Sequence, residues 1–234
     1  MTGKRLLAIC AIMSSVIMAS ANPSLGADGV AFSLDFSGFP GGSVLNWLES
    51  KGFEPKQDAE NTKKIVYLVT KNGLVIEAKT HVHALLLDDV SVKDYSRLRI
   101  EWGVHAFPSG ASYEKGIRSE AIMVYVFFGK ERHSSGSILI PDSPYFMGLF
   151  LCESGSINVP YKGRYFHAGG RYVCVDRPAR DVPVTTEIAI AELFTRVFGK
   201  DAPDVSGIGI AVDTSNVKGT GVAESFIRKI EFLQ

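Results

Sequence analysis

The chain has 234 residues, of which 46% are hydrophobic, and its 25 basic and 25 acidic side chains give a formal net charge of zero. This balance argues against a nucleic-acid partner, which would require a basic stripe. The length suits one β-sandwich domain, residues 28–234, behind a cleaved leader.

The first 27 residues have the pattern of an export signal. Lys4 and Arg5 precede an apolar run, residues 6–18, that is too short to cross a membrane. Small residues that suit cleavage lie at Ala21 and Ala27. The sequence therefore predicts a periplasmic or secreted protein with no membrane anchor after cleavage.

Two of the three cysteines lie beyond the leader, which contains Cys10. Cys152 and Cys174 are an even pair, and in an oxidising compartment such a pair favours a disulfide, worth about 3 kcal/mol in the chain-entropy estimate. Both lie in strand-like runs that can be neighbours. The alternative is two buried free thiols.

Alternating apolar residues predict strands through the first half of the domain. These strands are Val30–Phe36, Lys64–Lys71, Leu74–Val82, Leu85–Val90 and Leu98–Phe107. Asn72-Gly73 predicts a hairpin between the second and third of them. The segment Ser43–Gly52 is either a short helix that turns Trp47 inward or an irregular crossing.

The run Ala121–Phe128 is apolar on both faces, which predicts a strand at the centre of a sheet, covered on both sides, with Val124 in the core. Loops 108–120 and 129–144 flank it. Further strands are expected at Tyr145–Cys152, Tyr165–Asp176 and Val184–Glu187.

The C-terminal part predicts a helix followed by a closing hairpin. Helical spacing over Ala189–Phe198 ends at Gly199, which suits a left-handed cap. Val205–Leu233 then gives two alternating runs, with Phe226, Arg228, Ile230 and Phe232 expected on one face of the second. The fold class is an all-β, antiparallel jelly-roll sandwich with one short helix in its C-terminal half.

Several segments resemble an exported bacterial family catalogued as domain of unknown function 3047. They are SLDFSG, SEAIMVYVFFG, ELFTRVFGKDAP, SGIGIAVDTSN and ESFIRKIEFL. The resemblance implies a jelly roll similar to galactose-binding-like domains and carbohydrate-binding modules. The family pattern has two acids before the central strand and a basic residue within it; here Ser119 and Glu120 precede the strand, and Met123 replaces the basic residue.

Two groups of residues are candidate metal ligands. His81 and His83 lie two apart on a predicted strand, so both rings point to the same face and could share a metal; a third ligand would have to come from His105, His133 or His167, and the alternative is an exposed polar face. Asp213, Thr214 and Asn216 place oxygens at a strand end, as a structural calcium ion requires, or form an Asx-type turn. We expect no other cofactor.

The stretch Pro160–Tyr172 predicts a glycan-binding surface, since aromatic rings stack on sugars and basic side chains reach their polar groups. Its candidate ligand-binding residues are Tyr161, Arg164, Tyr165, His167, Arg171 and Tyr172. Tyr165 and Tyr172 share a face only if Gly169-Gly170 forms a bulge. Otherwise the rings pack in the sandwich and the arginines solvate its edge.

The sequence thus favours a non-catalytic binding domain for a carbohydrate or another cell-envelope glycan. An enzyme is the alternative: a polysaccharide lyase or hydrolase using Glu120, His167 and Tyr172, or a glycosidase pairing carboxylates from Glu114, Glu120 and Asp213. A structural or assembly partner is the third possibility.

Overall fold

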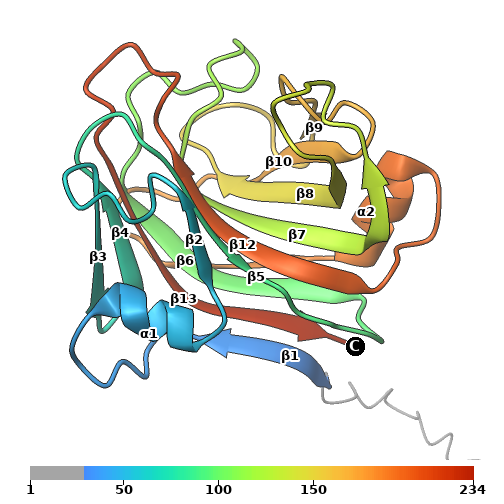
Figure 1. Cartoon of the computed structure of the whole chain (residues 1–234), viewed down its shortest axis with the longest axis horizontal. Helices are drawn as coiled ribbons and strands as arrows, with labels where there is room; N and C mark the ends of the chain where they lie inside the picture. Colours follow the sequence, from blue (N-terminus) through green and yellow to red (C-terminus); the bar gives the residue numbers. More distant parts are fainter. Residues whose placement is uncertain (1–28) are drawn as a thin grey trace, which may run out of the picture.

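Two β-sheets packed face to face form the body of the protein, for which a computed structural model describes residues 29–234 (Figure 1). The expected export leader therefore lies outside the described residues. The arrangement is the predicted all-β sandwich of jelly-roll class. None of the helices within residues 29–234 combines the length and apolar character needed to cross a membrane.

The first sheet, sheet A, is organised around its long C-terminal strand β13. Its strands follow the order β11-β6-β13-β4-β3. On the edge of β13 opposite β6, β4 pairs with residues 223–227 and β1 with residues 229–233. Their bounds are β1 Val30–Asp35, β3 Ile65–Thr70, β4 Gly73–Ala78, β6 Arg97–Ala106, β11 Val184–Ile188 and β13 Ala223–Leu233. Every pair in this sheet is antiparallel.

The second sheet, sheet B, has the order β2-β5-β12-β7-β8-β10-β9. Its bounds are β2 Glu54–Gln57, β5 His83–Asp88, β7 Glu120–His133, β8 Ser143–Leu151, β9 Pro160–Tyr161, β10 Gly170–Asp176 and β12 Val205–Asp213. The pair β8–β10 is parallel, an exception to the antiparallel arrangement that the sequence predicts. The predicted Cys152–Cys174 disulfide is confirmed and joins the end of β8 to β10.

Two helices accompany the sheets, one more than the fold prediction contained. Helix α1, Val44–Ser50, settles the first ambiguous segment: the Ser43 hydroxyl caps it by accepting from the Asn46 amide, and Trp47 is buried. Helix α2, Ile190–Phe198, ends at Gly199 with φ of 71°, as its spacing predicts.

The core lies between the sheets, and its central strand is β7. Val124 is 0% exposed and belongs to this core, which confirms its predicted place. Trp102 of β6 is also fully buried, and its indole N–H donates to the Thr186 hydroxyl on β11, so the ring enters the core without an unpaired polar atom.

The predicted closing hairpin is wrong, because β12 lies in sheet B and β13 in sheet A. Alternation assigns the two faces of a strand but does not identify its neighbour in a sheet. The loop 214–222 crosses from one sheet to the other.

The predicted faces of β13 are also partly wrong. A bulge between Ile227 and Lys229 leaves Arg228 without a counterpart on β6 and reverses the alternation. Ile227 therefore lies in the core with Ile230, while Phe226 packs on the His105 ring at 4.8 Å instead.

Three further boundaries differ from the sequence prediction. Thr70 pairs with Gly73, so Lys71 and Asn72 connect β3 to β4, and Gly73 begins β4 with φ of 92°. The strand expected from Tyr165 begins only at Gly170, and residues 162–169 form a loop. β7 also continues beyond the predicted run, to His133.

Val124→Asp tests the position of β7. The substitution places a carboxylate in the core with no partner, so we expect it to lower the free energy of unfolding by several kcal/mol. Denaturant unfolding followed by fluorescence measures this change. A variant as stable as the parent protein would contradict the central position of the strand.

Candidate functional site

The surface of sheet B that faces away from sheet A is lined by aromatic side chains. Along β7, Ile122, Val124 and Val126 lie in the core, so Tyr125 and Phe127 point outward. We define the aromatic face as Tyr125, Phe127, Phe146, Phe150 and Tyr172. Tyr125, Phe127 and Tyr172 are half-buried and thus partly open to solvent.

Glycines let these rings lie across the strands. A side chain at Gly148 would approach the Tyr172 ring to 3.1 Å and the Tyr125 ring to 3.2 Å, and one at Gly170 would collide with the Phe146 ring. The rings contact one another as well, with centroids 5.9 Å apart for Tyr125 and Phe127 and 5.8 Å for Phe146 and Tyr172. The alternation of glycine with aromatic residues therefore creates the face.

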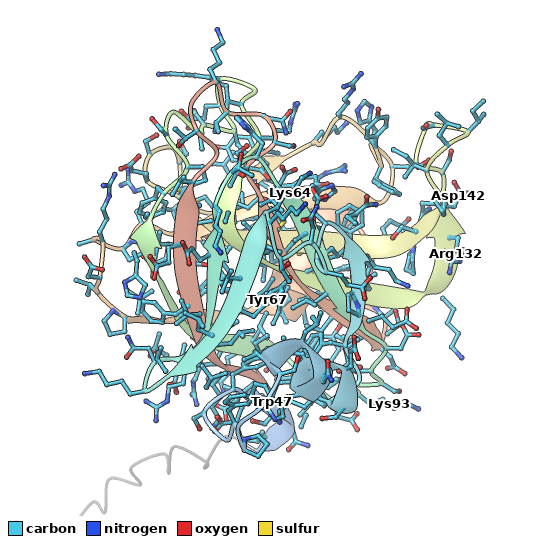
Figure 2. All side chains as sticks on the ribbon, turned by 60° about the vertical axis from the view of Figure 1, so that its left-hand side comes forward. Trp47, Lys64, Tyr67, Lys93, Arg132 and Asp142 are labelled. Atoms are coloured by element: carbon cyan, nitrogen blue, oxygen red, sulfur yellow. A yellow bond between two sulfur atoms is a disulfide. The ribbon has the colours of Figure 1, made fainter. Side chains whose placement is uncertain are left out.

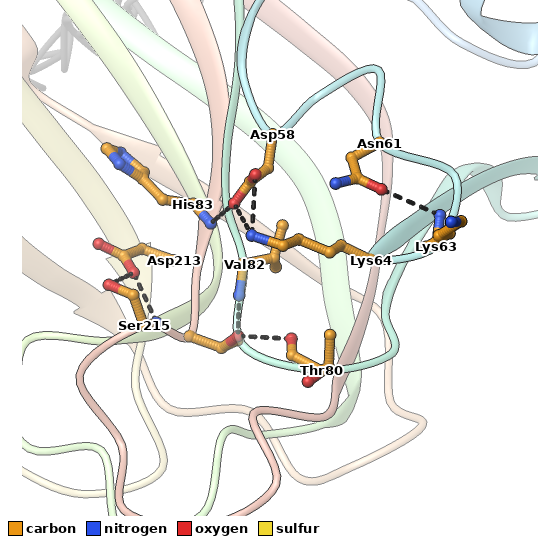
Figure 3. A network of polar contacts seen from close by, with 10 residues as sticks. Asp58, Asn61, Lys63, Lys64, Thr80, Val82, His83, Asp213 and Ser215 are labelled. Atoms are coloured by element: carbon orange, nitrogen blue, oxygen red, sulfur yellow. Dashed lines mark hydrogen bonds and ion pairs between the residues drawn. The ribbon is translucent and has the colours of Figure 1, made fainter.

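Three ionisable residues, two acids and a histidine, form a row beside the aromatic face. We call this row of Glu120, Asp213 and His83 the acid row. Asp213 of β12 pairs with Glu120 of β7 on one side and with His83 of β5 on the other. A register shift on β7 brings both Glu120 and Met123 to the outer surface. Figure 3 shows the side chains of His83 and Asp213 pointing to the same side.

A neighbouring ion pair secures the strand that contributes His83. The Asp58 carboxylate accepts from the His83 backbone N–H at 3.2 Å and pairs with Lys64 at 2.9 Å (Figure 3). These contacts join the turn after β2 to the start of β5, so they hold the backbone of His83 in place.

The pKa of the Glu120 carboxyl group is strongly perturbed by its surroundings. Glu120 is only 4% exposed, and this burial raises the pKa of its carboxyl group well above the usual range. The negative charge of Asp213 raises the pKa further, and the hydroxyl of Tyr113, which donates to Glu120 at 2.7 Å, opposes the rise. The carboxyl group therefore keeps its proton to a higher pH than a solvated glutamate does.

The loop between β6 and β7 covers this part of sheet B. Tyr113 stacks on Phe150 with centroids 4.3 Å apart and also contacts Tyr161 and Tyr172. Glu114 holds the loop by accepting from the Ser156 N–H at 2.9 Å. The cavity left beside Tyr113 has a volume of about 20 Å³, room for about one water molecule and too small for a sugar ring.

Two further polar groups lie at the edge of this cover. Burial raises the pKa of the Tyr172 hydroxyl to about 12, although a hydrogen bond with Tyr125 and, more weakly, the positive charge of Arg118 oppose the rise. The Nε of Arg118 is buried and has no hydrogen-bond partner among the described residues. Arg118 thus has an unused donor within electrostatic range of the aromatic face.

The six residues predicted to bind a glycan do not form one surface. Tyr172 belongs to the aromatic face, and Tyr161 adjoins it through the Tyr113 ring, which contacts both tyrosines. Arg171 turns to the other side of β10, where its guanidinium lies 5.3 Å from the Phe198 ring of α2. Arg164, Tyr165 and His167 lie in the loop 162–169, so no continuous strand relates Tyr165 to Tyr172, and the question of a bulge at Gly169-Gly170 does not arise.

Several of the predicted metal ligands are engaged with other partners. Asp213 accepts from the Ser215 N–H at 2.8 Å and from its hydroxyl at 2.6 Å, which is the Asx-type alternative, and Asn216 donates to the Arg118 carbonyl. The His81 ring contacts the Val217 carbonyl. Residues 29–234 contain no cluster of three His, Cys, Asp or Glu that could hold a metal ion.

The sequence prediction missed most of the aromatic face. The run Ala121–Phe128 was expected to be covered on both sides, yet the loop over Glu120 leaves Tyr125 and Phe127 half-buried. The available signal was the period-two pattern itself, because the residues between the core positions of β7 and β8 are aromatic or glycine except for Met123.

No protein-family model and no curated protein matches the chain. Among the similar solved structures is an endoglucanase from Rhodothermus marinus, with 10% identity and a TM-score of 0.42 over 88% of this chain and 98% of that chain. An endo-1,4-β-glucanase has 10% identity and a TM-score of 0.37 over 70% of this chain and 86% of its own. A family 11 xylanase from Neocallimastix patriciarum has 9% identity and a TM-score of 0.31 over 78% of this chain and 96% of its own. The similarity concerns the arrangement of the strands alone.

Glu120→Gln tests the burial of the carboxyl group. The folded chain keeps the Glu120 proton above pH 4.3, where an unfolded glutamate has lost half of its protons, so ionisation favours unfolding as the pH rises. We therefore expect the melting temperature of the parent to fall relative to that of the variant as the pH rises above about 4.3. Parallel profiles for the two proteins would contradict the raised pKa.

Proposed function

We propose that this chain is an exported, non-catalytic protein that binds a carbohydrate chain along the outer surface of sheet B. The observation that carries the proposal is the aromatic face with the acid row beside it. Aromatic rings offer apolar contact to the C–H groups of a pyranose, and carboxylates accept hydrogen bonds from its hydroxyls.

The partly exposed members of the face supply the contact area. Tyr125, Phe127 and Tyr172 come from β7 and β10, with β8 between them, so their rings extend across three adjacent strands. Leu85 and Leu87 continue the apolar surface on β5, beyond the small residues of β12. A surface of this width suits several consecutive sugar units better than one buried monosaccharide.

The charges beside the face favour a neutral glycan. Asp213 is half-buried and acts as an acceptor next to the rings, and it repels a negatively charged polysaccharide. A polymer rich in hydroxyl groups and without carboxylates donates to Asp213 without this repulsion.

Glycoside hydrolysis is the second candidate, favoured by the position of Glu120 opposite Asp213. A carboxyl group with a raised pKa can act as the general acid, and a neighbouring carboxylate as the base or nucleophile. Tyr113 covers Glu120, which favours the binding function. The alternative lyase set is less well supported, since the exposed His167 makes no side-chain hydrogen bond within the described residues.

A panel of neutral and acidic glycans, scored for retention and for new reducing or unsaturated ends, tests the proposal. We expect retention on a neutral glycan without new ends, and Phe127→Ala to weaken binding about tenfold because it removes a contacting ring.

Two controls sharpen this experiment. Phe39→Ala removes a half-buried ring that packs on Trp47 of α1, and Tyr165→Ala removes one from the loop 162–169. Both should bind as the parent does. Loss of binding in Tyr165→Ala but not in Phe127→Ala would place the site in the loop, and new ends that disappear in Glu120→Gln would establish the hydrolase.

Tyr113→Ala tests the cover over the acid row. We expect this variant to bind the glycan more tightly, because the Phe150 ring and Glu120 become accessible, and to unfold about 3 kcal/mol more easily through loss of a packed ring. Tyr113→Phe keeps the ring and should bind as the parent does. Titration calorimetry below both melting temperatures measures the affinities. Weaker binding by the alanine variant would make Tyr113 part of the binding surface.

A further inference from the structure

Two aliphatic side chains at the tip of the loop between β7 and β8, residues 134–142, are almost completely exposed to solvent. Ile138 is 102% exposed and Leu139 is 87% exposed, far more than any other large hydrophobic side chain within the described residues. Figure 1 shows the loop in yellow-green at the upper right, beside β9 and β10, and in Figure 2 it projects above the labelled Arg132 and Asp142.

The base of this loop is built by specific polar contacts. The buried Ser135 hydroxyl lies 2.9 Å from the Ser137 carbonyl oxygen and 2.6 Å from that of Ile140. The Ser135 N–H donates to the Asp142 carboxylate, and the Ser135 carbonyl accepts from the Phe166 N–H at 2.9 Å. The loop therefore has internal structure that holds its tip, Ile138 and Leu139, out from the body.

The segments that adjoin the loop carry a net positive charge although the whole chain is neutral. The adjoining segments, 129–145 and 162–171, contain five basic residues, Lys130, Arg132, Lys162, Arg164 and Arg171, against two acidic ones, Glu131 and Asp142. Both acids are engaged: Glu131 pairs with Lys200 at 3.7 Å, and Asp142 accepts from Ser135. The segments touch, since a side chain at Gly169 would meet the His133 ring at 3.1 Å.

We propose that residues 134–142 attach the protein peripherally to a phospholipid bilayer with anionic headgroups. Ile138 and Leu139 enter the boundary between headgroups and acyl chains, and the neighbouring lysines and arginines lie against the headgroup phosphates. Apolar insertion and electrostatic attraction together give reversible binding where one alone is weak.

The shape of the tip favours a bilayer over a protein partner. A stable protein interface needs roughly 1,000 Å² of buried, complementary surface. Two side chains on a projecting loop offer much less, and basic residues lie in the segments that adjoin the loop. A bilayer needs no matching pocket, because its acyl chains adapt to the inserted side chains. This inference does not depend on glycan binding by the aromatic face.

Vesicle co-sedimentation with residues 28–234 tests the proposal. The probes are phosphatidylcholine vesicles with and without about 30% phosphatidylglycerol. We expect binding to the anionic vesicles that weakens with added salt. Ile138→Ser with Leu139→Ser should lower the partition coefficient at least tenfold, since each side chain loses its apolar burial.

The matched control replaces two exposed valines elsewhere, Val182→Ser with Val222→Ser, whose residues are 47% and 45% exposed. This variant should bind vesicles as the parent does, and all three proteins should melt at similar temperatures because surface changes of this kind cost little. Lys162→Gln with Arg164→Gln should reduce the binding to anionic vesicles.

Three outcomes would overturn the proposal. One is absence of binding to anionic vesicles, and another is equal binding by the parent and the Ile138→Ser, Leu139→Ser variant. The third is concentration-dependent self-association in sedimentation velocity that the same variant abolishes, because the tip would then be an interface between copies of this chain.

Discussion

Burial of the inner side of β7 is the constraint on which the rest of the structure depends. Ile122, Val124, Val126 and Phe128 fill the space between the sheets and are fully buried. Since side chains alternate along a strand, their burial forces Met123, Tyr125 and Phe127 to the outer surface of sheet B. The candidate site is therefore the reverse side of the core strand, and its position follows from the packing of the interior.

The buried carboxyl group of Glu120 explains why a loop must cover one end of that surface. A charged carboxylate is costly to bury, so Glu120 takes a raised pKa and a hydrogen bond from Tyr113. The same Tyr113 ring stacks on Phe150, next to the Cys152–Cys174 disulfide. Electrostatics and ring packing thus fix the loop 108–119 over the acid row and leave the aromatic rings beyond it partly open.

Small changes of register decide which residues can act together. On β13 one extra residue, Arg228, sends Phe226 to the outer surface and Ile227 to the core. On β7 a shift of the same kind gives Glu120 and Met123 a common face with Asp213. A strict period of two predicts neither pairing, because the bulge arises from the neighbouring strand and leaves no local signal in the chain.

The sequence alone determined the sandwich class, most strands, the helix ending at Gly199, the core position of Val124 and the pairing of the two cysteines. Alternation and helical spacing can be read from neighbouring residues, and the cysteine pair from a count, so none of these results needs the tertiary structure. Tertiary structure decided that β12 and β13 lie in different sheets, that β8 and β10 are parallel, and that Tyr165 lies in a loop and not on the strand of Tyr172. It also assembled Tyr113, Glu120 and Asp213, which lie up to 100 positions apart. Contacts between such distant residues depend on strand order and register, which are set by the mutual burial of whole faces.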